Sequence, residues 1–362
     1  VSGGLAYSGG QSRIGAVMAI DEVNAAGGIK SMGGTKLEAL LGDSQSRPEI
    51  GVSEVERMQQ DGVSAYLGCF ASGIALPATQ AAAKYNTPFL IDVGASDLIV
   101  TRGLKNVFRL KPGFGKCVDD AIVTLGDMNK AANNVAKTAV IVHEESEFGT
   151  GTAKLLAGKL PGINIQPVET IKHANPTRDF SNIALRIKGL KPDLVIMSNY
   201  QNEYVLLART LMQQKVDATM FSVLGGGFNY KLIKEQPDVA QYMMDFNHWF
   251  NPRNAKAMAL KKQVESKGNL FTFELYLSYN CIMLYADALQ RAGSADKEKA
   301  IAALAASTWF PEIMPYGPTK FVNGQNEGGR GVLLQASKTD IEVVAPEQFA
   351  SAKPVFPRPK MG

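Results

Sequence analysis

Short apolar runs alternate along the first part of the chain with stretches whose apolar residues recur every three or four positions. The runs predict strands at 5–7, 37–41, 65–67, 89–91 and 107–110. The stretches between them predict helices, including one at 49–60 that carries Ile50, Val55 and Met58. Strands that alternate with helices through short connections form parallel sheets with right-handed crossovers. This part of the chain therefore predicts a doubly wound α/β sheet.

The same alternation restarts at Phe114. Strands are predicted at 138–142, 164–170, 193–197 and 220–223, and helices at 114–128, 151–160, 180–189 and 203–214. From about residue 251 the pattern changes to long helices at 255–267, 271–292 and 297–306, then to a hairpin signal at 323–324 and strand-like runs at 332–334 and 341–344. We expect an α/β protein with two Rossmann-like lobes in tandem and a ligand cleft between them.

Small and hydroxylated residues follow two neighbouring predicted strands. Ser72 follows the run at 65–67, and Ser96 lies in Gly94-Ala95-Ser96-Asp97 after the run at 89–91. The carboxyl ends of parallel strands meet at one edge of a sheet, where ligands bind in folds of this kind. Hydroxyls and the amides beside them can donate hydrogen bonds to a carboxylate. Either serine alone is equally well explained as a helix N-cap, but two at successive strand ends favour a binding site.

Length and composition narrow the class of protein. A chain of 362 residues and 38.9 kDa favours two domains, and 45% hydrophobic with 20% charged residues is typical of globular proteins. The net charge of +4 comes without a basic block, so we expect no nucleic-acid partner. The sequence contains no apolar stretch long enough to cross a bilayer, and no signal peptide, and it opens at Val1 as a processed product does. Three widely spaced cysteines fit no metal or redox motif.

Catalytic chemistry has little support in the sequence. The three histidines lie outside any metal-binding or nucleophile motif. Glu144 and Glu145 at a strand end are an acid/base pair or, in the favoured interpretation, a charged strand end facing solvent. The glycines at 225–227 lack the pattern of a phosphate-binding loop. Tyr200 is either an aromatic at the cleft edge or a capping residue with its hydroxyl in water. We expect neither an enzyme nor a bound metal or cofactor.

Several motifs resemble one known family. They include Ser8-Gly9-Gly10, the helix end at 21–29 with Asn-Ala-Ala-Gly-Gly-Ile, Gly94-Ala95-Ser96-Asp97, Asn106-Val107-Phe108-Arg109, Phe148-Gly149-Thr150-Gly151 and Arg178-Asp179-Phe180-Ser181. Together they resemble the type I periplasmic solute-binding proteins of branched-chain amino acid ABC transporters, and the likeness extends from Tyr7 to about Asn326. The resemblance implies a two-lobed clamp with three hinge crossovers. It implies an amino-terminal lobe of 1–117 plus 251–320 and a carboxy-terminal lobe of 118–250 plus 321–362.

The resemblance also implies a set of ligand-binding residues. Ser72 matches the serine that binds a ligand carboxylate, Ser96 matches a threonine that assists it, and Gly94 matches a position whose carbonyl faces the ligand. Phe148 stands where a tyrosine is common, and Tyr200 matches an aromatic of the second lobe. Further expected lining residues are Ala95, Phe70, Gly225 and Arg13, the last being an extra anion contact or, equally, a solvated helix residue.

Departures from the family pattern bear on the ligand. Amino-acid binders place an acid that holds the α-ammonium where this chain has Gly225, and a cysteine pair of the family is matched by Ser46 and Ala71, so that disulfide is expected to be absent. A buried ammonium without a carboxylate is costly. With Phe70, Phe148, Tyr200 and Phe228 nearby, we expect an aromatic carboxylate such as a benzoate or phenylpropenoate derivative. The alternative is a branched-chain amino acid or an amide.

The resemblance further implies a periplasmic, monomeric protein that delivers its ligand to a membrane permease. A ligand-sensing receptor domain would share the same clamp, and the sequence does not separate the two. An enzyme acting on a small acid is disfavoured, because no base, nucleophile or cofactor loop is evident. A transcriptional regulator would need an added helix-turn-helix, and the chain begins directly with the first predicted strand.

Overall fold

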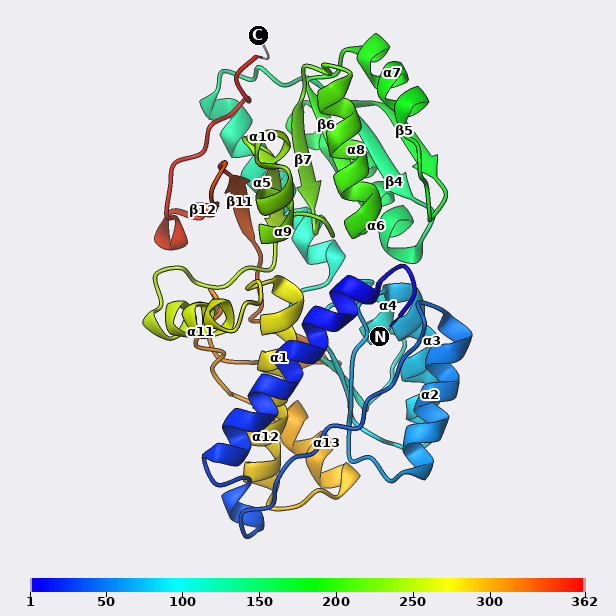
Figure 1. Ribbon diagram of the computed structural model, residues 1–362, viewed down its shortest axis with the longest axis vertical. Coiled ribbons are helices and arrows are strands. Elements are labelled where there is room, and N and C mark those ends of the chain that lie inside the picture. The colour runs from blue at the N-terminus through cyan, green and yellow to red at the C-terminus, as the bar shows by residue number, and fades with distance from the viewer. Residues whose placement is uncertain (1, 361–362) are drawn as a thin grey trace. The chain divides into compact units, whose positions relative to one another are not determined.

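A computed structural model describes residues 2–360 (Figure 1). The chain divides into two compact units: unit 1 comprises 1–113 and 271–330, and unit 2 comprises 114–270 and 331–362. The chain therefore passes three times from one unit to the other. Each unit is built around one sheet with helices on its faces, which confirms the predicted α/β class with two doubly wound sheets.

Unit 1 carries a five-stranded sheet in the order β1-β2-β3-β10-β9. Its strands are β1 Tyr66–Leu67, β2 Phe89–Ile91, β3 Val107–Arg109, β9 Phe321–Val322 and β10 Gln325–Asn326. Its helices are α1 Ala6–Ala25, α2 Pro48–Gln60, α3 Ser72–Ala83, α4 Leu98–Thr101, α12 Phe273–Ala292 and α13 Lys297–Ala305. All pairs are parallel except β9 with β10, which form the hairpin predicted at Asn323-Gly324.

Two apolar layers cover the two faces of this sheet. Leu90 and Phe108 lie in the cluster that contains α1, α12 and α13, whereas Phe89 and Val107 lie in the cluster that contains α2 and α3. Successive strand residues point to opposite faces, so α1 and α2 cover opposite faces. Figure 1 shows α1 and α12 side by side, and Gly15 permits this approach, because a Cβ there would lie 1.8 Å from the Leu275 carbonyl oxygen.

Unit 2 carries a seven-stranded sheet in the order β12-β11-β8-β7-β6-β4-β5. Its strands are β4 Thr138–Glu144, β5 Gln166–His173, β6 Leu194–Ser198, β7 Thr219–Val223, β8 Met244–Asn247, β11 Val332–Ala336 and β12 Ile341–Ala345. Its helices are α5 Phe114–Ala131, α6 Glu147–Lys159, α7 Ser181–Leu190, α8 Gln201–Gln213, α9 Tyr230–Glu235, α10 Pro237–Ala240 and α11 Ala255–Ser266. The pairs from β5 to β8 are parallel, and β11 is antiparallel to both β8 and β12.

Two predicted strands near the start of the chain are wrong. Residues 5–7 lie at the beginning of α1, and residues 37–41 belong to no strand. Apolar side chains mark both runs, but a strand needs a neighbour to receive its backbone hydrogen bonds. The sheet of unit 1 ends at β1, and no strand of residues 2–360 lies beyond it.

The division into units also differs from the expected lobe boundaries. Helix α11, which we expected in the amino-terminal lobe, belongs to unit 2, where Lys261 Nζ donates to Tyr230 Oη at 3.1 Å and lies 4.5 Å from the centre of that ring. Residues 321–330, expected in the carboxy-terminal lobe, belong to unit 1 because Gln325 pairs with Arg109 of β3.

Candidate functional site

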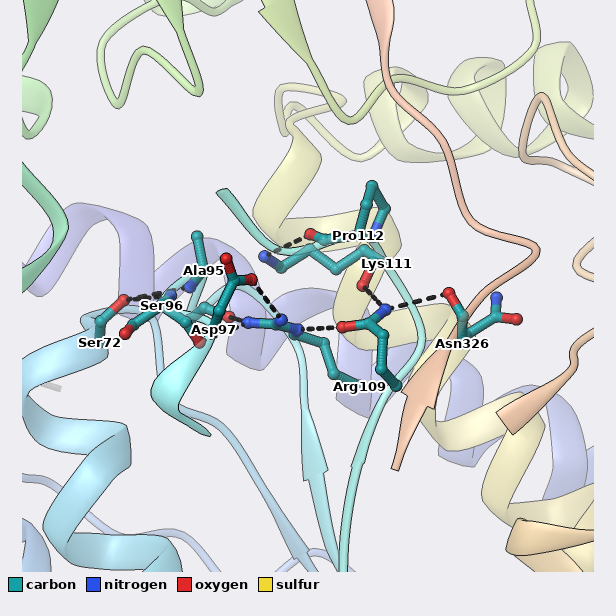
Figure 2. A network of polar contacts seen from close by, with 10 residues as sticks. Ser72, Ala95, Ser96, Asp97, Arg109, Lys111, Pro112 and Asn326 are labelled. Carbon is teal, nitrogen blue, oxygen red and sulfur yellow. Dashed lines mark hydrogen bonds and ion pairs between the residues drawn. The ribbon is translucent and has the colours of Figure 1, made fainter. Parts of the chain in front are cut away.

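Ser72 begins helix α3 at the carboxyl end of β1, where it is 1% exposed. Its Oγ accepts hydrogen bonds from the backbone N–H groups of Ala95 and Ser96, both at 3.1 Å (Figure 2). The N-cap of α3 is Ala71, so the interpretation of Ser72 as a helix cap is wrong. The structure brings Ser72, Gly94, Ala95 and Ser96 together at the ends of two adjacent parallel strands.

The two bonds that Ser72 accepts orient its hydroxyl. A serine oxygen has two acceptor positions and one hydrogen to donate. The amides of Ala95 and Ser96 occupy both acceptor positions, so the hydrogen points away from the loop at 94–96. This arrangement prepares Ser72 to donate to an anionic or carbonyl oxygen.

A buried arginine holds the loop beside Ser72. Arg109, at the end of β3, is 1% exposed, and its Nη1 donates to the carbonyls of Ser96 at 2.7 Å and Gly94 at 3.4 Å. Its Nη2 forms an ion pair with Asp97 at 3.1 Å, and its Nε donates to Gln325 Oε1 at 2.7 Å (Figure 2). The guanidinium fork thus fixes both ends of the loop against β3 and β10. The Gly94 carbonyl, expected to face a ligand, is at the same time an acceptor for Arg109.

The remaining two predicted residues of unit 1 lie elsewhere. Phe70 is partly buried in the turn after β1, and Arg13 is exposed on α1. Both line a cavity beside β1, and Ser72 and residues 94–96 do not contribute to the lining of that cavity. Arg13 is therefore better described as a solvated helix residue than as a second anion contact of the Ser72 loop.

In unit 2, Phe148 and Tyr200 form an aromatic pair. Their ring centres lie 5.6 Å apart with an angle of 17° between the planes, and both side chains are 6% exposed. Phe148 lies in the first turn of α6, after β4, and Tyr200 is the N-cap residue of α8, after β6. Because β4 and β6 are neighbours, the two rings meet at the carboxyl edge of the sheet. Such flat apolar rings are of the kind that an aromatic ligand contacts, although only a small part of each is exposed in this structure.

Glu144 is hydrogen-bonded to the backbone of Tyr200, one member of this pair. It is fully buried, so the prediction of a strand end facing solvent is wrong for Glu144, while Glu145 is exposed. Oε1 accepts from Ser146 Oγ at 2.8 Å, and Oε2 accepts from the Tyr200 N–H at 3.1 Å. Burial raises the pKa of Glu144 to about 8, and these hydrogen bonds oppose the shift only in part. The acid is therefore held largely protonated at neutral pH.

Gly225 follows β7 in a position with no room for a side chain. A Cβ there would lie 2.6 Å from Ser222 Oγ and 2.8 Å from Cε2 of Tyr204. The Gly225 N–H donates to Oδ1 of the buried Asp245 at 3.0 Å, and Ser222 Oγ donates to the same oxygen at 2.8 Å. An acid at position 225 is therefore incompatible with the local packing, and the carboxylate beneath it already has partners.

Sequence patterns did not identify Arg109, Glu144 or Asp245 as parts of these two arrangements. Each is a charged residue within or at the end of an otherwise apolar strand. A charged side chain in such a position is buried by the sheet and needs hydrogen-bonding or charged partners. A charge in an apolar strand is therefore the sequence signal that could have identified these residues. The partners themselves lie far away in the chain and leave no local pattern.

Within residues 2–360, no group of three or more His, Cys, Asp or Glu side chains is arranged to hold a metal ion. No described helix combines the length and apolar character that a membrane span requires. Cys69, Cys117 and Cys281 are free thiols in this structure.

A fold with two doubly wound units joined by three crossings is that of the type I periplasmic binding proteins, and solved structures share it. A branched-chain amino acid transporter substrate-binding protein, LivJ, from Streptococcus pneumoniae in complex with isoleucine superposes with a TM-score of 0.82 at 22% identity, covering 94% of this chain and 95% of that one. A solute-binding protein of an ABC transporter from R. palustris in complex with benzoate gives 0.81 at 19% identity, covering 98% and 94%.

The family model for periplasmic binding proteins matches residues 1–339, and the chain belongs to this family. Among similar sequences, the Leu/Ile/Val-binding protein BraC3 of Rhizobium johnstonii is 30% identical over 226 residues, which are 62% of this chain and 59% of that protein. A leucine-, isoleucine-, valine-, threonine- and alanine-binding protein of Pseudomonas aeruginosa is 26% identical over 317 residues, 85% of this chain and 81% of that protein. The resemblance in the sequence motifs is thereby confirmed at the level of the family.

Proposed function

We propose that this protein is the extracytoplasmic solute-binding component of an ABC uptake transporter, and that its ligand is a small aromatic carboxylate. The Ser72 hydroxyl, which the loop at 94–96 of unit 1 holds in place, binds the carboxylate, and the Phe148–Tyr200 pair of unit 2 contacts the ring. Binding draws the two units together, and the closed form is recognised by the membrane permease.

The surroundings of Gly225 are the observation that favours an aromatic acid over an amino acid. The two short distances from its Cβ position exclude a side chain, and Asp245 below it already accepts hydrogen bonds from Gly225 and Ser222. Unit 2 therefore offers no carboxylate here to an α-ammonium, whose burial without a counter-charge is costly. Similar folds are known in complex with benzoate and 3,4-dihydroxybenzoic acid, which supports this ligand class, and with isoleucine, which supports the alternative.

One observation favours the alternative, an amino acid or an amide. Glu274 in the first turn of α12 is fully buried, and neither carboxylate oxygen forms a hydrogen bond of good geometry with a described residue. Burial is the main cause that raises the pKa of Glu274 to about 7; the charge of the nearby Asp92 adds to the rise, and the polar groups of Ser8 and Thr272 oppose it. A ligand ammonium or amide placed against Glu274 would satisfy it.

A thermal-shift panel tests the proposal. We expect benzoate, hydroxybenzoates and phenylpropenoates to raise the melting temperature, and leucine, isoleucine and valine to leave it unchanged, because a ligand that binds only the folded state stabilises it. Benzamide, which has the ring without the charge, is the matched control and should have a weaker effect. Stabilisation by the amino acids alone would contradict the aromatic acid and favour the Glu274 alternative.

A further inference from the structure

A two-residue turn, Asn323-Gly324, joins β9 to β10 in unit 1. Both turn residues have positive φ, 50° and 79°, and Val322 pairs with Gln325 across them. Hairpin turns of this type favour Asn followed by Gly, because both residues can adopt the left-handed conformation. A Cβ on Gly324 would also lie 2.0 Å from the Val107 carbonyl oxygen of β3. Backbone conformation and packing therefore both require glycine at position 324.

The same turn leaves an asparagine side chain open to attack by the next backbone nitrogen. Asn323 and Gly324 form the only Asn-Gly pair in the sequence, and Asn323 is exposed. Neither the side-chain amide of Asn323 nor the Gly324 N–H is hydrogen-bonded to a residue among 2–360. Gly324 has no side chain to hinder its nitrogen. Because β9 is a two-residue strand at the sheet edge, local opening of the turn costs little free energy.

We propose that Asn323 is a site of spontaneous deamidation, and that isoaspartate formed there disconnects β10 from the loop at 94–96. Asparagine is one of the thermolabile residues of proteins. The Gly324 nitrogen loses its proton to water and bonds to Cγ of Asn323, and the amide nitrogen leaves as ammonia. One water then opens the resulting succinimide. Opening at Cγ gives aspartate, and opening at the α-carbonyl gives isoaspartate, whose main chain runs through Cβ and Cγ.

A second asparagine of the same segment is protected by its contacts. Asn326 is fully buried, and its Nδ2 donates to the Leu110 carbonyl at 2.8 Å. Its Oδ1 accepts from the N–H groups of Lys320 at 2.9 Å and Gly328 at 3.1 Å. These bonds hold the side-chain amide away from the backbone nitrogen that follows it. Asn326 is therefore a control for Asn323 within one short peptide.

The bonds that β10 makes with Arg109 explain why isoaspartate would act beyond the turn. The Gly324 carbonyl accepts from the Arg109 N–H, and Gln325 Oε1 accepts from Arg109 Nε, both at 2.7 Å. A two-residue turn with one more carbon in its main chain cannot keep both bonds and the pairing of β9 with β10. On its other side the Arg109 guanidinium donates to the Ser96 carbonyl (Figure 2). Loss of the β10 bonds therefore loosens the loop that orients Ser72.

Warming the protein in mildly alkaline buffer and mapping its peptides tests the modification. Trypsin cuts after Lys320 and Arg330, so one peptide contains both asparagines. We expect conversion of amide to acid at Asn323 to be at least about tenfold faster than at Asn326. Isoaspartyl methyltransferase should label residue 323. Asn323→Gly, which retains a left-handed turn, should accept no label there. Equal rates at the two asparagines, or no conversion of Asn323, would overturn the proposal.

Amide exchange at Ala95 and Ser96 tests the effect on the loop. Their N–H groups bond to Ser72 Oγ, and both should exchange at least about tenfold faster in the isolated isoaspartate form than in the unmodified protein. Freshly prepared Asn323→Asp has the new charge without the longer main chain and should exchange as the unmodified protein does. Unchanged exchange in the isoaspartate form, or an equal increase in Asn323→Asp, would overturn the connection. Neither measurement needs a ligand, so both remain decisive whatever the protein binds.

Discussion

At the scale of single residues, Ser72 shows which features of a site can be predicted from residue type and position after a strand. The pattern of strands was sufficient to place Ser72 and Ser96 at one sheet edge. It did not distinguish a helix cap from a loop contact, because the two amides that bond to Ser72 Oγ lie more than twenty residues along the chain. The environment of Gly225 could not be predicted from the sequence either, since it depends on Tyr204 and Asp245 of other elements.

Removing the Ser72 hydroxyl tests its role directly. Ser72→Ala should weaken binding of an aromatic carboxylate by about 1 to 3 kcal/mol, the range of a hydrogen bond to a charged group. Calorimetric titration measures this loss, and near-ultraviolet circular dichroism checks that the variant is folded. Ser266→Ala, at the exposed end of α11, is the control and should bind normally. An unchanged affinity for Ser72→Ala would remove this residue from the site.

At the scale of elements, long helices and buried strands were predicted closely, and isolated edges were not. β2 lies at the predicted residues, and α11 and α13 differ from the prediction by one residue at the end. The run at 37–41 has the composition of a strand but no neighbour to pair with among the residues that the structure describes. β8 was not predicted, because Asp245 and Asn247 interrupt its apolar pattern and are buried by partners from other segments.

Glu144, at the buried end of β4, should make the free energy of unfolding decrease as pH rises. Glu144 has a pKa of about 8 in the folded protein and an ordinary value of 4.5, so the folded state retains a proton that the unfolded state has released between these values. Stability should therefore fall as pH rises through this window, by at most about 1.4 kcal/mol per pH unit. Glu144→Gln copies the neutral acid and should remove the part of the slope that comes from Glu144, while the raised pKa of Glu274 keeps its own part.

Urea unfolding from about pH 5 to pH 8 measures the slope, which is proportional to the difference in bound protons between the two states. The control is Glu145→Gln, at the exposed neighbour, which should follow the unchanged protein. A Glu144→Gln variant that keeps the full slope would show that the decline comes from other groups.

At the scale of the whole molecule, the sequence predicted two lobes but not where each segment belongs. The tandem alternation of strands and helices was enough for the fold class. The placement of 255–266 and 321–330 was not, since it depends on contacts such as Lys261 with Tyr230 and the pairing of Gln325 with Arg109. Such contacts join residues far apart in the chain, so they cannot be predicted from local periodicity.

Ligand binding should change the dimensions of the molecule. A clamp that closes on its ligand becomes more compact, so small-angle scattering should give a smaller radius of gyration with a saturating aromatic acid than without it. Ser72→Ala at the same ligand concentration should show a smaller change. One radius under all conditions, with binding established by calorimetry, would contradict closure.

The pairing of Gln325 with Arg109 also dictates when the protein can finish folding. The sheet of unit 1 lacks β10 until the ribosome has passed residue 325, and unit 2 lacks β11 and β12 until it has passed residue 345. Domains made from one continuous segment can fold in turn as they emerge during synthesis. Here neither unit can, so the sheet of unit 1 is complete only after residue 326 has been made, and that of unit 2 only after residue 345.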